Sequence, residues 1–288
     1  MSKAYLDTTV LTDIVLKHNS ERGKTAAKAL ATYASRELPQ YAIKEFKKGP
    51  LRHAVYLHNK LVATQSVSDT FAALQALSRT PQRYKLSTSL ELLVEIERST
   101  ERTTNKDLVE KYGSDATAGK IRFDEYRLAL RVLVHKAWNR SLKVADIVNP
   151  ISCYINAKPY DERGLISLNP TACKPTTECC LGPELRSNPE ALIAMRAAIE
   201  RLPSKREHVR RIKSLKNLEN KAKMSEKDCD SLGDAILTFL APADATILTT
   251  NLSDFDPLAK ALGKTAQSPA ARLASLTNAP GNSDDAKE

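Results

Sequence analysis

Two short apolar segments near opposite ends of the chain constrain its fold most strongly. Residues 4–7 (AYLD) and 245–250 (ATILTT) each have the length and apolar or β-branched character of a buried strand. Asp7 closes the first segment, and Asp254 follows the second by a few residues. Ligands of open α/β sheets bind at the carboxyl ends of the strands, so these two acids can meet in one crevice.

Three further acids fit the same crevice. Asp234 lies on the helix predicted before the second strand, Asp230 lies one turn earlier on the same face, and Glu45 lies in a helix near the N-terminus. Converging carboxylates repel one another and lose hydration unless cations neutralise them. Hard oxygen ligands in that arrangement suit Mg²⁺ or Mn²⁺, which can activate water and stabilise charge on a phosphodiester. On a basic chain, this pattern indicates a metal-dependent nuclease.

Each acid also has an ordinary structural explanation. Asp7 could be the N-cap of a helix that begins near Val10, and Asp254 could cap the last helix. Glu45 could be a solvated helix residue, and Asp230 and Asp234 could form a polar helix face. The order of the acids along the chain favours a shared site over these separate explanations.

Three blocks of the sequence resemble the motifs of PIN-domain proteins. They are AYLDTTVLTDI (4–14), YAIKEFKKG (41–49) and GDAILTFLAPADATILTTNLSDFDPL (233–258). That family opens with a strand, an Asp, small polar residues and Val-Leu, and places a Glu in a helix after the second strand. It closes with an Asp, an Ala-rich helix, a strand ending in Thr, an Asn or Asp, and a further Asp-Phe.

The resemblance implies an α/β/α sandwich with a central parallel sheet. It also implies a Mg²⁺- or Mn²⁺-dependent endoribonuclease acting on single-stranded or looped RNA; many members are VapC-type toxins of toxin–antitoxin pairs, and others serve RNA maturation or decay. In that scheme Asp7, Asp234 and Asp254 hold one or two metal ions. Glu45 binds the metal or a water on it, and that water attacks the phosphorus in line.

The motif assigns supporting roles to further residues. Thr249 matches the Thr of the motif strand and Asn251 the polar residue after it, while Asp13 and Asp230 are additional candidates for the acidic set. The partners that the resemblance implies are RNA and an antitoxin or other protein. A homodimer is also open.

The chain departs from the family pattern in two ways. Thr9 stands where the family often has Asn, and 188 residues separate the second acid from the third. The resemblance therefore covers a discontinuous core at about 1–60 and 225–264. We predict a mostly helical insertion at 61–224, with an irregular Pro- and Cys-containing segment at 146–188, and a disordered tail at 265–288.

The net charge of +10 (44 Lys and Arg against 34 Asp and Glu) favours a polyanionic partner such as RNA. Residues 204–223 carry eight Lys and Arg against two Glu, and so supply +6 of this excess. They precede the Asp230/Asp234 helix, so they could lead a phosphate backbone toward the acids. A solvated helix face explains them equally well. The candidate RNA contacts are Arg206, Arg210, Arg211, Lys213 and Lys216.

Four of the five cysteines fall between Cys153 and Cys180, and the fifth is Cys229. A zinc knuckle is conceivable, but the C-x19-C-x5-C-C spacing lacks the C-x2-C pairs of such sites, so plain thiols are favoured. The absence of a leader pattern and of a long apolar run predicts a cytoplasmic protein with reduced thiols and no membrane segment.

Two other functions stay open beside the ribonuclease. A non-catalytic PIN-like RNA-binding or regulatory protein would keep the basic helix and have an incomplete metal site. A structure-specific DNA nuclease is the second alternative. The lack of a Gly-rich helix-hairpin-helix signature counts against it. No P-loop, G-x-G-x-x-G or Ser-His-Asp elbow is present, which removes the usual ATPases, dinucleotide enzymes and α/β-hydrolases.

Overall fold

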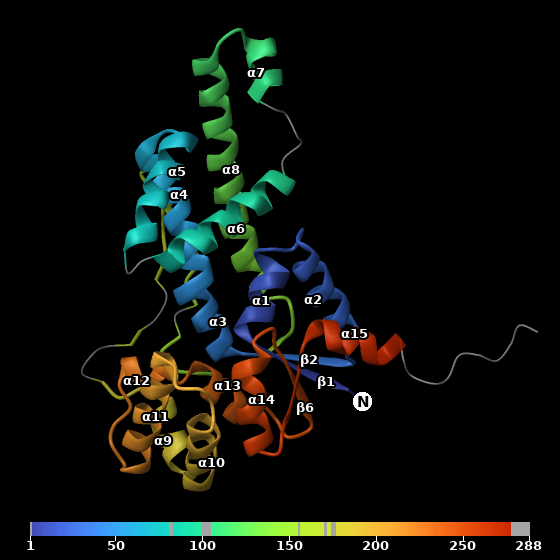
Figure 1. Cartoon of the computed structure of the whole chain (residues 1–288), viewed down its shortest axis with the longest axis vertical. Coiled ribbons are helices and arrows are strands. Elements are labelled where there is room, and N and C mark those ends of the chain that lie inside the picture. Colours follow the sequence, from blue (N-terminus) through green and yellow to red (C-terminus); the bar gives the residue numbers. More distant parts are fainter. Residues whose placement is uncertain are drawn as a thin grey trace, which may run out of the picture.

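A five-stranded parallel sheet forms the centre of the molecule, in the order β3-β2-β1-β6-β7 (Figure 1). The computed structural model describes residues 2–80, 83–99, 105–154, 156–169, 172–173 and 177–277. The strands are β1 (Lys3–Leu6), β2 (Ser35–Pro39), β3 (Asp146–Val148), β6 (Ala245–Leu248) and β7 (Thr265–Gln267). On β1, Ala4, Tyr5 and Leu6 are fully buried, as expected for a central strand covered on both faces. The predicted α/β fold with a central parallel sheet is confirmed.

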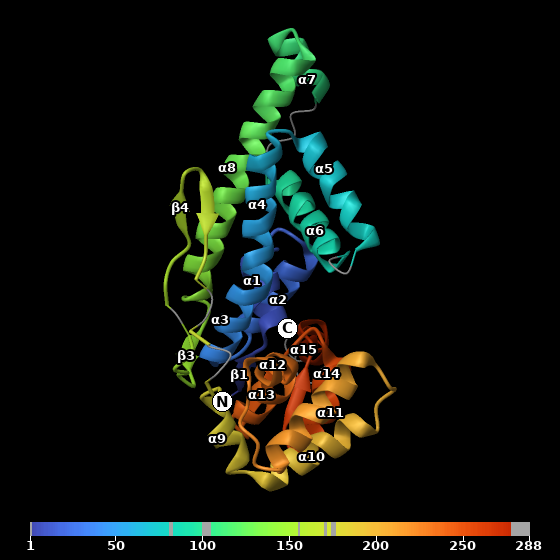
Figure 2. The same cartoon turned by 90° about the vertical axis from the view of Figure 1, so that its left-hand side faces the viewer.

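Helices cover both faces of the sheet. The chain moves along the sheet in one direction after β1 and in the other after β6. Since crossovers between parallel strands are right-handed as a rule, the helices after β1 and those around β6 are expected on opposite faces. Figures 1 and 2 show α1 and α2 on the side of a helical arm, with α13 and α14 on the other side. The flanking helices are α1 (Thr8–Val15), α2 (Glu21–Ala31), α3 (Gln40–Phe46), α13 (Gly233–Leu240), α14 (Leu252–Ala261) and α15 (Pro269–Thr277).

The arm extends away from the sheet and is helical (Figures 1 and 2). Its long helix α8 packs along α4 and α1, with Trp138 and Leu130 buried in the contact. The predicted mostly helical character of this region holds for its described residues. The elements are α4 (Arg52–Thr64), α5 (Val67–Ala76), the short 3₁₀ turn η2 (Leu77–Arg79), α6 (Arg83–Ser99), α7 (Asn105–Tyr112) and α8 (Asp115–Ser141).

A second group of helices lies at the opposite end of the molecule and leads back into the sheet (Figure 2). The group comprises α9 (Leu181–Arg186), α10 (Pro189–Glu200), α11 (Arg206–Glu219) and α12 (Glu226–Ser231). Ser225 and Asp228 form a capping box at the start of α12. Along the chain, a hairpin of β4 (Tyr160–Glu162) and β5 (Leu165–Ser167) comes between the arm and this group, and it packs against α4 of the arm. None of the helices in the described ranges combines the length and apolar character needed to cross a bilayer.

Gly and Pro usually mark a helix end, but the pair Gly49-Pro50 does not end the helical path that begins with α3. Both residues lie in the π-helical turn η1 (Lys47–Leu51), which joins α3 to α4. A π turn already departs from the usual hydrogen-bond ladder, so the missing N–H of Pro50 does not end the helical path. The helix α3, which carries Glu45, therefore continues through η1 into α4, the first helix of the arm.

The first part of the tail that we predicted to be disordered (265–288) is ordered. β7 pairs with β6 at the sheet edge, and α15 packs on α2. The Arg272 guanidinium stacks 4.3 Å from the centroid of the Tyr33 ring and donates to the Thr32 hydroxyl at 3.0 Å. These contacts compensate for the few large apolar residues on which the prediction rested. Residues 278–288 lie outside the described ranges.

The sheet also takes a strand from inside the predicted insertion at 61–224. β3 pairs in parallel with β2, with Leu38 opposite Ile147. A three-residue strand is too short to show a period in the sequence. The structural core therefore includes 146–148 and 265–277 beyond the ranges that the motifs delimit.

Candidate active site

The carboxyl ends of β1 and β6 form the topological switch point of the sheet. The chain leaves β1 for β2 on one side and β6 for β7 on the other. The register places Leu6 opposite Leu248, so the next residues, Asp7 and Thr249, are neighbours. The Thr249 hydroxyl donates to Asp7 Oδ2 at 2.8 Å, and the Thr9 hydroxyl donates to the same oxygen.

Asp7 is only 2% exposed. Burial raises the pKa of its carboxyl, and the hydrogen bonds from Thr9 and Thr249 oppose that rise. The residue stands at the N-cap position of α1 by its backbone, but its side chain makes no capping bond. The Asp7 carboxylate therefore accepts hydrogen bonds from Thr249 and Thr9 at the switch point and does not cap α1.

Glu45 approaches the same point from α3. The Thr8 hydroxyl donates to Glu45 Oε2 at 2.7 Å. A Cβ at Gly233 would lie 2.2 Å from Glu45 Oε1, so only glycine at the start of α13 leaves room for this carboxyl. Burial raises the pKa of Glu45 to about 8; Thr8 opposes the rise, and the charges of Asp234 and Asp7 add to it.

Asp234 and Asp254 lie in the first turns of α13 and α14, where the helix dipole favours a carboxylate. Arg211 of α11 joins them. Its Nη2 lies 2.8 Å from Asp234 Oδ2 and 3.6 Å from Asp254 Oδ2. Burial raises the pKa of Asp234 to about 7, Arg211 opposes this rise, and the charges of Asp7 and Asp254 add to it.

Asp254 lies close to one amide and two basic side chains. The Asn251 amide donates to Asp254 Oδ2 at 3.3 Å, and His208 Nε2 lies 3.7 Å from Asp254 Oδ1. Burial acts to raise the pKa of Asp254, but Asn251, Arg211 and His208 together hold it below its ordinary value. This acid therefore carries a full negative charge near neutral pH.

The structure separates Asp230 from this group by breaking the helix that we predicted to carry both Asp230 and Asp234. α12 ends at Ser231 and α13 begins at Gly233, with Leu232 between them. Asp230 therefore does not share a helix face with Asp234. Its two carboxylate oxygens instead lie 2.8 and 2.7 Å from Lys48 Nζ.

Asp13, the other additional candidate, pairs with neighbours on its own side of the sheet. Its Oδ2 lies 3.0 Å from Arg22 Nη2, and its Oδ1 lies 3.9 Å from Lys17 Nζ. Asp13 is buried and has two cationic partners, so its ion pairs with Arg22 and Lys17 explain it without a metal.

The basic helix α11 divides into two faces. Arg206, Arg210, Lys213 and Lys216 are exposed, whereas Arg211 is 7% exposed and turned toward the acids. A groove of about 920 Å³ runs between α11 and α12, and its lining includes Arg210, Lys213 and Arg211. Arg211 therefore lies between the groove and the acid group.

The acid group has the donor chemistry of a site for Mg²⁺ or Mn²⁺. All four carboxyls offer hard oxygens, and the ion pairs of these acids within the described residues involve only Arg211 and His208. The oxygens are not drawn tightly together: no three acidic side chains in the described ranges bring ligand atoms within 4.8 Å of one another. A bound cation would have to draw them inward.

Comparison of the chain with protein-family models, with curated proteins and with solved structures found no match. The resemblance to PIN-domain proteins therefore stays a prediction from the motif blocks.

The sequence reasoning missed the inward role of Arg211 and His208. The buried positions of α11 include His208, Arg211, Leu215 and Leu218, which follow the three- and four-residue spacing of a buried helix face. Reading that spacing would have placed Arg211 on the inner face despite its charge. The need for glycine at 233 has no such local signal, because it arises from the approach of Glu45.

Proposed function

We propose that this protein is a Mg²⁺- or Mn²⁺-dependent endoribonuclease. The observation that carries the proposal is the convergence of Asp7, Glu45, Asp234 and Asp254, from four separate elements, at the switch point of a parallel sheet. Arg211 is the single permanent cation paired with them in the described structure. Asp7 is buried and the other three acids are half-buried. Ionising all four so close together costs stability unless a further cation neutralises them.

The residues that would hold the metal are Asp7 and Asp234, with Asp254 and Glu45 completing the set. A divalent cation bound there would supply Lewis-acid stabilisation of charge at a phosphodiester and lower the pKa of water. The surrounding hydroxyls keep the acids in place: Thr249 and Thr9 orient Asp7, and Thr8 orients Glu45. Glu45 is thereby positioned either as a ligand or to orient the attacking water.

The exposed basic face of α11 supports RNA as the substrate. Arg210, Lys213 and Lys227 line a groove that Arg211, next to the acids, lines as well. The acidic side chains of Glu207, Asp228 and Asp230 line the same groove. Lys and Arg side chains along a groove bind a phosphate backbone without regard to sequence. An RNA strand in this groove would bring one phosphodiester to the acid group.

A non-catalytic RNA-binding protein is the second candidate, and one observation favours it. The Arg211 guanidinium already lies 2.8 Å from Asp234, where it supplies part of the neutralisation that a metal would give. If this ion pair is permanent, the acid group is a structural feature and the groove alone is functional.

Cleavage assays separate the two candidates. We expect the full chain to cut mixed single-stranded RNA in Mg²⁺ or Mn²⁺ and to stop cutting in EDTA, while still binding RNA. Asp7→Asn and Asp234→Asn should each lower the cleavage rate at least 100-fold without weakening RNA binding. RNA binding with no cleavage in either metal would favour the non-catalytic RNA-binding protein. Cutting of branched DNA in preference to RNA would favour a structure-specific DNA nuclease.

A further inference from the structure

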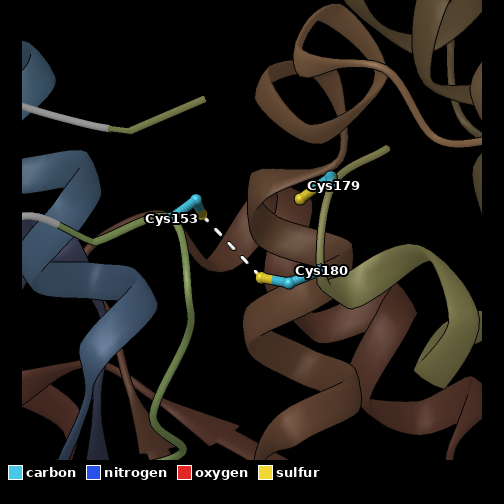
Figure 3. A group of neighbouring side chains, drawn as sticks. All are labelled: Cys153, Cys179 and Cys180. Carbon is cyan, nitrogen blue, oxygen red and sulfur yellow. Dashed lines mark hydrogen bonds between the residues drawn. The ribbon is translucent and has the colours of Figure 1, made fainter. Parts of the chain in front are cut away.

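The five cysteines, which the acid site does not use, come together in the structure. Cys153 lies after β3, Cys173 lies in the irregular segment, Cys179 and Cys180 precede α9, and Cys229 lies on α12. None of them forms a disulfide. Figure 3 shows that the side chains of Cys153, Cys179 and Cys180 point toward one another from two separate stretches of loop.

The spacing of these three sulfurs fits a single metal ion. Their Sγ atoms all lie within 4.8 Å of one another, and the sulfurs of Cys153 and Cys180 are 3.9 Å apart. Thiolates on a tetrahedral zinc ion, with bonds of about 2.3 Å, have sulfurs about 3.8 Å apart. An iron–sulfur cluster places several atoms between its thiolates and requires a wider spacing than this.

A fourth thiol lies on the same small cavity. Cys153, Cys173, Cys179 and Cys180 together line a hollow of about 200 Å³. Cys229 does not line it; its side chain is fully buried on α12, where it hydrogen-bonds the Cys179 side chain and its sulfur lies 3.7 Å from the Tyr41 hydroxyl. We assign Cys173 as the fourth ligand because it lines the cavity, and Cys229 is the competing candidate.

Lys44 is an independent sign that these sulfurs carry negative charge. Its side chain is 1% exposed, and its Nζ lies 3.3 Å from Cys153 Sγ, 3.5 Å from Cys173 Sγ and 3.5 Å from Cys229 Sγ. No carboxylate among the described residues forms an ion pair with it. A buried ammonium requires a counter-charge. Four thiolates on Zn²⁺ would supply one, because together they carry a net charge of about −2 that a lysine hydrogen-bonded to the sulfurs would partly offset.

We propose that Cys153, Cys173, Cys179 and Cys180 bind one structural Zn²⁺ ion, with Lys44 as the cation that hydrogen-bonds the sulfurs of Cys153 and Cys173. The ion would fasten the irregular stretch between β3 and α9 to α3, which carries both Lys44 and Glu45. The site does not depend on the proposed nuclease function. The adjacent pair Cys179-Cys180 and the long spacings explain why the sequence showed no zinc motif.

Metal analysis of the full chain tests this proposal. Protein purified without chelators, or refolded from denaturant with reductant and Zn²⁺, should contain about one zinc per chain, with zinc–sulfur distances of about 2.3 Å by X-ray absorption. Cys173→Ser, Cys179→Ser and Cys180→Ser should each lower the zinc content at least fivefold. Cys229→Ser is the matched control, since it removes a neighbouring buried thiol, and it should retain zinc.

Three outcomes would overturn the proposal: no zinc in the replete wild type, iron in place of zinc, or full zinc retention in Cys179→Ser and Cys180→Ser. Loss of zinc from Cys229→Ser with retention in Cys173→Ser would overturn the assignment of the fourth ligand. If the variants fail to fold, Co²⁺ substitution of the wild type remains decisive. Intense visible absorption from tetrahedral thiolate-bound cobalt is expected, and its absence refutes the site.

Discussion

Replacing Arg211 with Met keeps most of the side-chain volume and removes the one permanent cation that is paired with the acid group among the residues the structure describes. The guanidinium lies 2.8 Å from Asp234 and 3.6 Å from Asp254, and the Arg211 side chain is 9% exposed. At an effective dielectric constant of about 20, these separations correspond to gross attractions of roughly 6 and roughly 5 kcal/mol. The cost of desolvation offsets much of this, and removing one partner of a buried ion pair usually costs ~3–5 kcal/mol.

We therefore expect Arg211→Met to lower the free energy of unfolding by ~3–5 kcal/mol at pH 8 in EDTA. The loss should shrink in Arg211→Met/Asp234→Asn, because the second change removes one of the stranded charges. Mn²⁺ should stabilise Arg211→Met more than it stabilises the wild type, since the guanidinium no longer competes for the carboxylates.

Urea unfolding with and without Mn²⁺ measures both effects. Arg210→Met is the matched control, because it removes an exposed arginine from the same helix, and it should change stability by less than ~0.5 kcal/mol. The reasoning is refuted if Arg211→Met loses no more stability than this control, or if Mn²⁺ stabilises the variant and the wild type equally.

Three further perturbations test the site. Gly233→Ala places a Cβ 2.2 Å from Glu45 Oε1, so RNA cleavage should fall at least tenfold with little change in melting temperature; Gly119→Ala, where a Cβ meets nothing within 4 Å, is the control that should stay active. Burial raises the pKa of Glu45 to about 8 and of Asp234 to about 7. In the metal-free folded protein these two carboxyls therefore keep protons that the same carboxyls of the unfolded chain release near pH ~4. Its stability should therefore fall as pH rises from ~4 to 8, by up to ~1.4 kcal/mol per pH unit for each proton, and a flat unfolding curve in EDTA would contradict this. Charge reversal at Arg210 and Lys213 should weaken RNA binding and flatten its salt dependence, whereas an unchanged affinity would exclude the groove.

The sequence predicted the parts of the site that follow from strand ends. Asp7 and Thr249 come directly after β1 and β6, so the pairing of these strands brings them together without any other information. The α/β class follows from the same two segments. Glu45 and Asp234 lie on helices whose approach to the strand ends no local pattern fixes, and their placement rested on the motif resemblance.

The features that the sequence did not predict depend on packing between distant segments. β7 and α15 gain stability from β6 and α2, and their own composition gives no sign of it. The charge of Arg211 predicts an RNA contact, although its spacing belongs to the buried face of α11. The five cysteines meet only because β3, α9 and α12 are brought together, and their order along the chain does not reveal it.

Anomalous diffraction from crystals soaked in Mn²⁺ tests the central claim most directly. We predict a manganese peak between Asp7 and Asp234, with oxygen ligands at about 2.0–2.2 Å, and Arg211 displaced from Asp234. The account is contradicted if no peak appears at any Mn²⁺ concentration that the crystals tolerate and the Arg211–Asp234 ion pair remains intact.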